Sequence, residues 1–223
     1  MTRKVLEDAA NLLARHYGPL AQSGPPGEWI TLVRVVLERR RSVKNGRDWS
    51  WVDETALRTP AETAAQAVPL LMETLESEGY PATGAIALSG CAQWWLREIG
   101  DADAISVFRQ RPLESWQRAL RAIRGVSWEL ADRILLAVAG LAVFPLGRGS
   151  LRIAARHGWM GLEDDYDEWQ AFFVGSLRDR DLDLAQLAQW TERLSHDFCG
   201  PTPKCELCPL KGLLPANGPV PLD

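Results

Sequence analysis

Apolar residues recur along this chain at the three- and four-residue spacing of amphipathic helices. A first helix is predicted within residues 3–18, where the pattern ends at Gly18-Pro19, and a second within residues 25–41. Their apolar faces comprise Val5, Leu6, Ala9, Leu12 and Leu13 in the first and Trp29, Leu32, Val33, Val36 and Leu37 in the second. Further helices are predicted within residues 59–79, 86–100, 101–110, 112–123, 127–140, 149–158, 165–178 and 182–198. No alternation of apolar and polar residues indicates a strand, so the pattern predicts an all-α fold.

The composition is that of a globular protein, with 223 residues of which 46% are hydrophobic and 24% are charged. This length can form one large domain or two small ones with a core of their own. The longest apolar run, residues 134–147, contains Gly140 and Pro145, and at about 14 residues it is too short to cross a bilayer. The N-terminal residues carry acids and no long apolar core, so they are not predicted to be a secretory signal. We therefore expect a soluble, cytoplasmic, monomeric protein without a membrane partner.

The net charge of −4 disfavours a simple nucleic-acid-binding protein, because such proteins usually carry an excess of Lys and Arg. The charges are unevenly distributed, however. Basic residues cluster at Arg39, Arg40, Arg41, Lys44 and Arg47, whereas acidic residues cluster within residues 163–168. These patterns leave two interpretations open, which are a basic surface on an acidic protein and ordinary solvated charges.

Residues 119–140 are typical of two helices joined by a tight hairpin, with the turn at Arg124, Gly125, Val126 and Ser127. Gly125 allows a backbone conformation that other residues adopt only at a cost in free energy. The amides of such a turn and of the helix that follows it can bind an anion, including a phosphate of a nucleic-acid backbone, without reading base sequence. The alternative is an ordinary packing corner between two helices.

The sequence of this hairpin resembles that of the endonuclease III-like DNA glycosylases in the helix–hairpin–helix superfamily, which is approximately Leu-Pro-Gly-Val-Gly followed by a Lys and an Ala. The matching residues are Ile123, Gly125, Val126 and Ala131, whereas Arg124 replaces the proline and Ser127 replaces the second glycine. About 70 residues later, as in the family, residues 199–218 (CGPTPKCELCPLKGLLPANG) resemble the [4Fe–4S] loop, particularly that of the adenine-mismatch glycosylases. On these two motifs the chain is identified as a divergent member of this family.

The resemblance implies two helical lobes with a DNA-binding groove between them. One lobe would comprise residues 27–144 and carry the hairpin at about residues 112–140. The other would combine residues 1–26 with residues 145–212, and residues 213–223 would form a tail. The resemblance also implies base excision repair, in which double-stranded DNA is bound and bent, a base is flipped out and its glycosidic bond is cleaved. Double-stranded DNA is thus the implied partner.

Other residues occupy the positions that would carry this chemistry. Bifunctional members use a lysine amine to form a Schiff base, and the resemblance places that lysine at Glu129. The catalytic aspartate maps to Gly147. We therefore predict no β-lyase activity and weak or absent glycosylase activity. Glu129 could itself act as a catalytic carboxylate, but the helix dipole and pairing with Arg133 explain an acid in this first turn more simply. By the same reasoning, Asp132 is expected to be a surface charge.

The expected DNA-binding residues lie in three places. The hairpin contributes Arg124, Gly125, Val126 and Ser127, and a segment resembling the one that enters the DNA in the family contributes Arg39, Arg40 and Arg41. Arg148, next to the aspartate position, completes the set. Trp94 and Trp95 fall near a loop that enters the base stack in the family, although paired tryptophans in a helical protein more often belong to the core.

Three of the four cysteines lie close together, which is typical of a metal or cluster site rather than of an extracellular disulfide framework. The family's loop has the spacing Cys-x6-Cys-x2-Cys-x5-Cys. Here Cys199-x5-Cys205-x2-Cys208 is followed by leucine at about residue 214, and Cys91 is not expected to reach the loop. The best local substitute for the fourth ligand is His196. A [4Fe–4S] cluster, a zinc ion held by three thiolates and an imidazole, and no metal all remain open.

Three functions are compatible with these observations. The first is a DNA-binding protein of the base excision repair family that binds damaged or distorted duplex DNA with little or no family chemistry. The second is an active monofunctional DNA glycosylase whose carboxylate has moved to Glu129. The third is a metal-bound interaction protein without a DNA function. A steep fall of DNA affinity with rising salt would separate the first two from the third.

Overall fold

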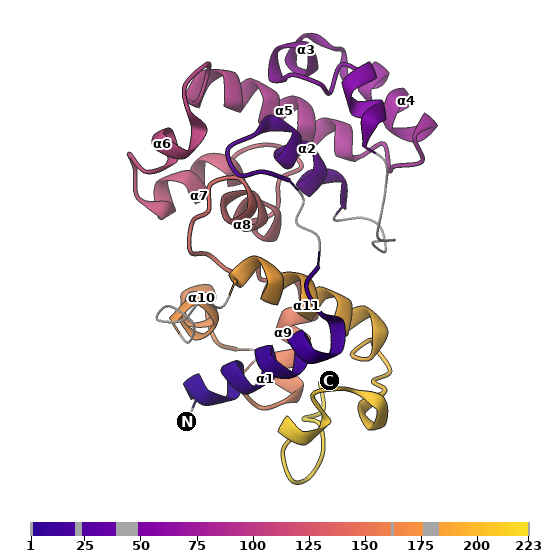
Figure 1. Cartoon of the computed structure of the whole chain (residues 1–223), viewed down its shortest axis with the longest axis vertical. Coiled ribbons are helices and arrows are strands. Elements are labelled where there is room, and N and C mark those ends of the chain that lie inside the picture. The colour runs from indigo at the N-terminus through magenta and orange to yellow at the C-terminus, as the bar shows by residue number, and fades with distance from the viewer. Residues whose placement is uncertain (1, 21–23, 39–48, 162, 176–182, 223) are drawn as a thin grey trace. The chain divides into compact units, whose positions relative to one another are not determined.

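The chain folds into helices joined by turns and loops (Figure 1). The computed structural model describes residues 2–20, 24–38, 49–161, 163–175 and 183–222. The regular elements among these residues are all helical, which confirms the predicted all-α class. They form two compact units, which we call the hairpin unit (residues 21–141) and the cysteine unit (residues 1–20 and 142–223). None of the described helices is both long and apolar enough to cross a bilayer.

The hairpin unit is built around one long central helix. Its elements are α2 (Trp29–Glu38), η1 (Ser50–Glu54), α3 (Pro60–Ala65), α4 (Val68–Ser77), α5 (Gly84–Glu98), α6 (Ala104–Phe108), α7 (Leu113–Arg121) and α8 (Trp128–Ala137). The central helix α5 packs against α2, α3 and α4, while α8 packs against α2 and α7. The two helices of the predicted hairpin are therefore α7 and α8, and both belong to the same unit.

Tryptophans form much of the core around α5. Trp94 and Trp95 are both buried, which confirms the prediction that they belong to the core. The Trp94 ring meets the edge of Trp116 at a centroid distance of 6.1 Å, and Trp95 meets Trp29 at 5.7 Å. The Trp116 indole N–H donates a hydrogen bond to the carbonyl of Phe108 at 2.9 Å, so the polar atom of this ring is satisfied inside the core.

Residues 59–79, predicted as one helix, form the two helices α3 and α4. Thr59 caps α3, because its Oγ1 accepts a hydrogen bond from the N–H of Glu62 at 3.1 Å. The first helix then ends at Gln66, whose backbone is extended. Pro69 lacks the N–H that a continuous helix needs, and it instead occupies the first turn of α4, where an N–H is not required. The break follows from proline rather than from the hydrophobic pattern.

The cysteine unit combines the two ends of the chain. Its elements are α1 (Thr2–Tyr17), α9 (Arg148–Arg156), α10 (Tyr166–Gly175), α11 (Leu184–Asp197), η2 (Cys205–Leu207) and η3 (Lys211–Leu213). α11 packs against α1 and α9, and Phe144 stacks on Phe173 with ring planes 4° apart. After η3 the chain returns to α9, where the N–H of Val220 donates to the carbonyl of Arg156 at 2.8 Å. The predicted tail, residues 213–223, is thus attached to α9.

Candidate functional site

The turn between α7 and α8 depends on one glycine. Gly125 has a φ of +88°, in the left-handed region that side chains disfavour. A Cβ atom at this position would lie 3.2 Å from the backbone nitrogen of Ala87 and 3.3 Å from its Cβ, so α5 leaves little room. The N–H of Val126 closes the turn by donating to the carbonyl of Ile123 at 3.0 Å, and the Val126 side chain is buried. Both the backbone conformation and the available space therefore require glycine at the hairpin.

Ser127 begins α8 as its N-cap. Its backbone is extended, and its Oγ accepts a hydrogen bond from the N–H of Leu130 at 3.2 Å. The positive end of the α8 dipole therefore lies at the turn, next in sequence to the exposed Arg124. The helix dipole and the guanidinium charge both favour an anion at this end of the hairpin.

An exposed tryptophan that the sequence analysis did not single out lies beside the turn. Trp128 is the first residue of α8 and is 55% exposed. The guanidinium carbon of Arg121 lies 3.8 Å from the Trp128 ring centroid, which is a cation–π contact. This end of the hairpin is therefore both basic and aromatic. A large apolar residue directly after a capping serine, where the core periodicity does not require one, is the sequence feature that could have revealed it.

Asp132 is buried, so the prediction of a surface charge is wrong. Its carboxylate is completely inaccessible, and Oδ1 accepts hydrogen bonds from Gln117 at 2.8 Å and from Arg121 at 3.4 Å. Burial raises the pKa of this carboxyl to about 6, and the hydrogen bond from Gln117 and the charge of Arg121 oppose the rise. The pattern of α8 alone misleads because α7 supplies the partners that make burial of this charge tolerable. Asp132 thereby ties α8 to the arginine that stacks on Trp128.

The two positions at which the family resemblance places the reactive groups carry different residues and contacts. Glu129 accepts a hydrogen bond from Nη2 of Arg133 at 3.0 Å, which confirms the predicted pair one turn apart on α8. Gly147 precedes α9, and its N–H donates to Oγ of Ser150 at 3.1 Å. Arg148, the first residue of α9, is exposed. The other predicted DNA-binding residues, Arg39, Arg40 and Arg41, lie outside the described residues.

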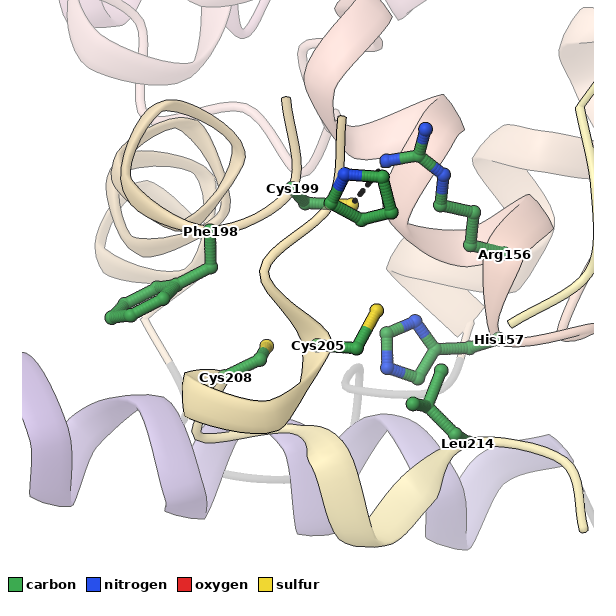
Figure 2. Close-up of a pocket in the computed structure, with 8 residues that line it drawn as sticks. Arg156, His157, Phe198, Cys199, Cys205, Cys208 and Leu214 are labelled. Carbon is green, nitrogen blue, oxygen red and sulfur yellow. Dashed lines mark hydrogen bonds between the residues drawn. The ribbon is translucent and has the colours of Figure 1, made fainter. Parts of the chain in front are cut away.

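A small pocket in the cysteine unit brings together the cysteines of the C-terminal loop (Figure 2). Its lining comprises Arg156, His157, Phe198, Cys199, Pro203, Cys205, Cys208 and Leu214. Leu214, at the position of the family's fourth cysteine, therefore contributes a methyl-bearing side chain to the same pocket as the three thiols. Burial raises the pKa of the Cys208 thiol; the backbone at Leu210 opposes this rise, and Cys199 and Cys205 add to it.

The fourth cysteine does not belong to this pocket. Cys91 lies in α5 of the hairpin unit and is completely buried. Burial raises the pKa of its thiol to about 12, so this thiol stays protonated and inert in the folded protein.

Arg156 of α9 holds the beginning of the cysteine loop. Its Nη1 donates to the carbonyl of Gly200 at 2.7 Å, and its Nη2 donates to the carbonyl of Pro201 at 2.9 Å. Nη1 also lies 3.4 Å from the sulfur of Cys199, a contact drawn in Figure 2. A guanidinium beside a sulfur favours the thiolate, which is the form of cysteine that binds metals. α9 thus supplies both an anchor for the loop and a positive charge for the pocket.

The histidine in this pocket is not the predicted one. His196 lies in the last turn of α11 with its side chain 71% exposed, its Nδ1 is 3.0 Å from Oδ1 of Asp197, and it does not line the pocket. His157, which directly follows α9, does line it and is only 6% exposed. Burial lowers the pKa of the His157 imidazole, and the carbonyls of Ile153 and Leu210 oppose this shift. Spacing could not reveal His157, because it lies 42 residues before Cys199.

The donor set of the pocket suits a metal that prefers sulfur and nitrogen. Three thiols and one neutral imidazole are the ligand types of structural zinc sites and of some iron–sulfur centres. The imidazole Nε2 of His157 is buried and makes no hydrogen bond of ordinary geometry with the described residues. In the described part of the chain no three His, Cys, Asp or Glu side chains converge on a common point, so metal binding requires these side chains to rotate toward the pocket centre.

Sequence comparison and structure comparison give different results for this chain. No protein-family model matches the sequence, and no curated protein matches it. Among solved structures, endonuclease III in a non-covalent complex with DNA matches with a TM-score of 0.64 and 14% identity, covering 96% of this chain and 95% of that chain. A thermostable thymine-DNA glycosylase matches with a TM-score of 0.62 and 14% identity, covering 95% and 94% of the two chains.

A third match is the 3-methyladenine DNA glycosylase of H. pylori bound to 1,N6-ethenoadenine. Its TM-score is 0.56 at 18% identity, and the match covers 85% of this chain and 93% of that chain. The matches to endonuclease III and the thymine-DNA glycosylase cover so much of this chain that they include both of its units, and the low identities agree with the predicted divergence. This chain has the fold of the helix–hairpin–helix DNA glycosylases.

Proposed function

We propose that this protein binds damaged or distorted double-stranded DNA through the hairpin, as a repair-family protein with no β-lyase chemistry and little or no glycosylase chemistry. The fold supports this proposal because the endonuclease III structure with the same fold is a DNA complex. The hairpin supports it through the positive φ of Gly125, the Ser127 cap and the exposed Arg124. Together these features favour a phosphate at the start of α8 without any base readout.

The observation that carries the proposal is the contrast between an intact hairpin backbone and substituted reactive positions. A glutamate cannot form a Schiff base, and Glu129 is already paired with Arg133. Glycine at position 147 offers no charge to stabilise an oxocarbenium-like transition state. The backbone features that bind a phosphate are therefore retained, whereas the side chains that perform the family's reaction are absent from their family positions.

DNA affinity as a function of salt tests the binding part of this proposal. Fluorescence anisotropy would compare duplexes carrying a stable abasic-site analogue, a mismatch or no lesion. The affinity of the wild-type protein should fall steeply as salt rises, because phosphate contacts release counterions. Arg124→Ala should weaken binding and reduce the salt slope by about one unit. Arg109→Ala, which removes another exposed arginine of the same unit, should leave both unchanged. Absence of binding at low salt would refute the proposal.

An excision screen tests the chemical part. Duplexes with oxidised, alkylated and mismatched bases should be left intact, and sodium borohydride should trap no covalent adduct on abasic DNA. Excision of any lesion that Glu129→Gln abolishes would instead establish the second function, a glycosylase with a relocated carboxylate. An adduct that persists in Glu129→Ala would identify another amine as the nucleophile and refute the absence of lyase chemistry.

We also propose that the cysteine pocket holds a [4Fe–4S] cluster through Cys199, Cys205 and Cys208, with a zinc ion as the alternative. The clustering of three thiols beside the Arg156 guanidinium supports a metal centre. Such a centre would stabilise the loop, because metal binding adds to the free energy of folding. Iron analysis and the visible spectrum of protein purified without oxygen test this. Iron with a brown colour supports the cluster, colourless zinc protein supports the alternative, and metal-free protein contradicts both.

A further inference from the structure

We infer that His157, rather than a residue of the cysteine loop itself, is the fourth ligand of the metal centre in the cysteine pocket. This inference rests on the metal centre proposed above and specifies its missing ligand. The loop offers three cysteines, and at the place of a fourth it has Leu214, which has no donor atom. Thiophilic centres of this kind usually have four protein ligands, so one more donor must come from outside the loop.

The position of His157 in the fold meets this need. His157 caps the C-terminal end of α9 and lines the same pocket as the three cysteines. In Figure 2 its imidazole lies beside Cys205 and Leu214, on the side of the pocket where the loop lacks its fourth cysteine. The neighbouring residue Arg156 is bonded to the loop backbone, so α9 is held against the pocket that His157 enters.

The hydrogen bonding of His157 prepares one nitrogen for a metal. Nδ1 is 2.7 Å from the carbonyl of Ile153, and a carbonyl can only accept, so Nδ1 carries the proton. Nε2 is then the unprotonated nitrogen with a lone pair. This atom is buried and makes no hydrogen bond of ordinary geometry within the described residues. Metal-binding histidines characteristically bond their other ring nitrogen to a carbonyl or carboxylate in this way.

The competing explanation is that His157 only fills space. A buried polar atom without a partner costs about 1–3 kcal/mol, so a purely structural position would favour an apolar residue of similar size. The ring also packs against Trp159 at a centroid distance of 4.7 Å, which fixes its plane but satisfies neither nitrogen. A ligand role explains the unpartnered nitrogen, and packing alone does not.

Three variants of the full chain test the inference. His157→Ala removes the donor, His157→Cys replaces it with a thiolate, and His196→Ala removes the histidine that is close to the cysteines in sequence but outside the pocket. Each protein is purified without oxygen and analysed for iron and zinc. Each metal-free form is then titrated with Co²⁺, whose visible absorption differs between sites with three and four sulfur ligands.

We expect His157→Ala to bind Co²⁺ at least about tenfold more weakly than wild type and to be purified with less metal. His157→Cys should retain the metal but shift the Co²⁺ absorption toward that of a four-sulfur site. His196→Ala should match the wild type in both measurements. Circular dichroism of each variant shows whether it is folded. If His157→Ala does not fold, the comparison of the wild type with His157→Cys still decides the ligand.

Failure of the inference differs from failure of the metal proposal. Wild-type protein that contains no metal and binds no Co²⁺ overturns both. Wild-type protein with metal, together with a His157→Ala variant of equal affinity or a His157→Cys variant with an unchanged spectrum, overturns only the role of His157. Loss of metal in His196→Ala, with retention in His157→Ala, would restore the histidine of α11 as the ligand.

Discussion

The hairpin and the cysteine pocket respond differently to sequence change. The hairpin is formed by consecutive residues, and its key features are the backbone of Gly125 and the cap at Ser127. The pocket joins the end of α9 to a loop more than 40 residues later, and its key features are the donor atoms of side chains. Backbone geometry survives replacement of neighbouring side chains, so Arg124 and Glu129 can differ from the family without loss of the turn. A metal site that loses one donor needs a specific replacement.

The largest effect is expected at the anchor of the pocket. Arg156→Ala removes two charge-assisted hydrogen bonds to the carbonyls of Gly200 and Pro201 and the contact with the Cys199 sulfur. Because the arginine is buried, we expect a loss of about 3–4 kcal/mol in the free energy of unfolding of the cysteine unit. Urea denaturation of metal-free protein measures it. Arg148→Ala, at the exposed start of the same helix, should change stability by less than about 0.5 kcal/mol. Equal effects of the two variants would contradict the anchoring role.

The next largest effect separates space from backbone strain at the hairpin. Gly125→Ala places a Cβ at positive φ and 3.2 Å from the backbone of Ala87, and we expect a destabilisation of about 2–3 kcal/mol with weaker DNA binding. Gly140 also has a positive φ, of +63°, but a Cβ there would meet no atom within 4 Å. Gly140→Ala should therefore cost only about 1 kcal/mol, all of it backbone strain. Denaturation of both variants gives the difference, and equal losses would show that α5 does not constrain the turn.

The same contrast explains what the sequence could predict. The helices, the hairpin and the capping of α3 by Thr59 were predictable because periodicity, glycine and caps act between residues close in sequence. His157 was not predictable, since nothing local distinguishes it from His196. Asp132 was misjudged for a related reason: its partners Gln117 and Arg121 lie on α7, and only packing shows that they face it.

A pH dependence from Asp132 follows in size. Its pKa is raised to about 6 in the folded protein, mainly by burial, whereas in the unfolded chain it is near the ordinary value of 3.8. The folded state therefore binds the proton more tightly. The resulting stability is fully present below about pH 4 and is lost as the pH rises to about 6, by an amount on the order of 2 kcal/mol.

Asp132→Asn tests this dependence, because the amide keeps an acceptor for Gln117 but does not titrate. The difference in unfolding free energy between variant and wild type should change between pH 4 and pH 6 and stay constant above that range. The charged groups that face Asp132 are Arg121 and, at longer range, Glu129, and neither is altered by the substitution. Parallel pH curves for the two proteins would mean that Asp132 does not titrate in this range.

The smallest effect concerns Glu129, where the binding and catalytic interpretations make opposite predictions. Its pair with Arg133 is partly exposed, so a double-mutant cycle with Glu129→Gln and Arg133→Gln should give a coupling of only about 0.3–0.5 kcal/mol, decreasing with salt. Glu129→Gln also removes a negative charge from the first turn of α8, where a phosphate would bind. DNA affinity at low salt should therefore rise, by about two- to fivefold. A hairpin that only binds DNA gains from this substitution, whereas a glycosylase that uses Glu129 as its carboxylate loses excision activity.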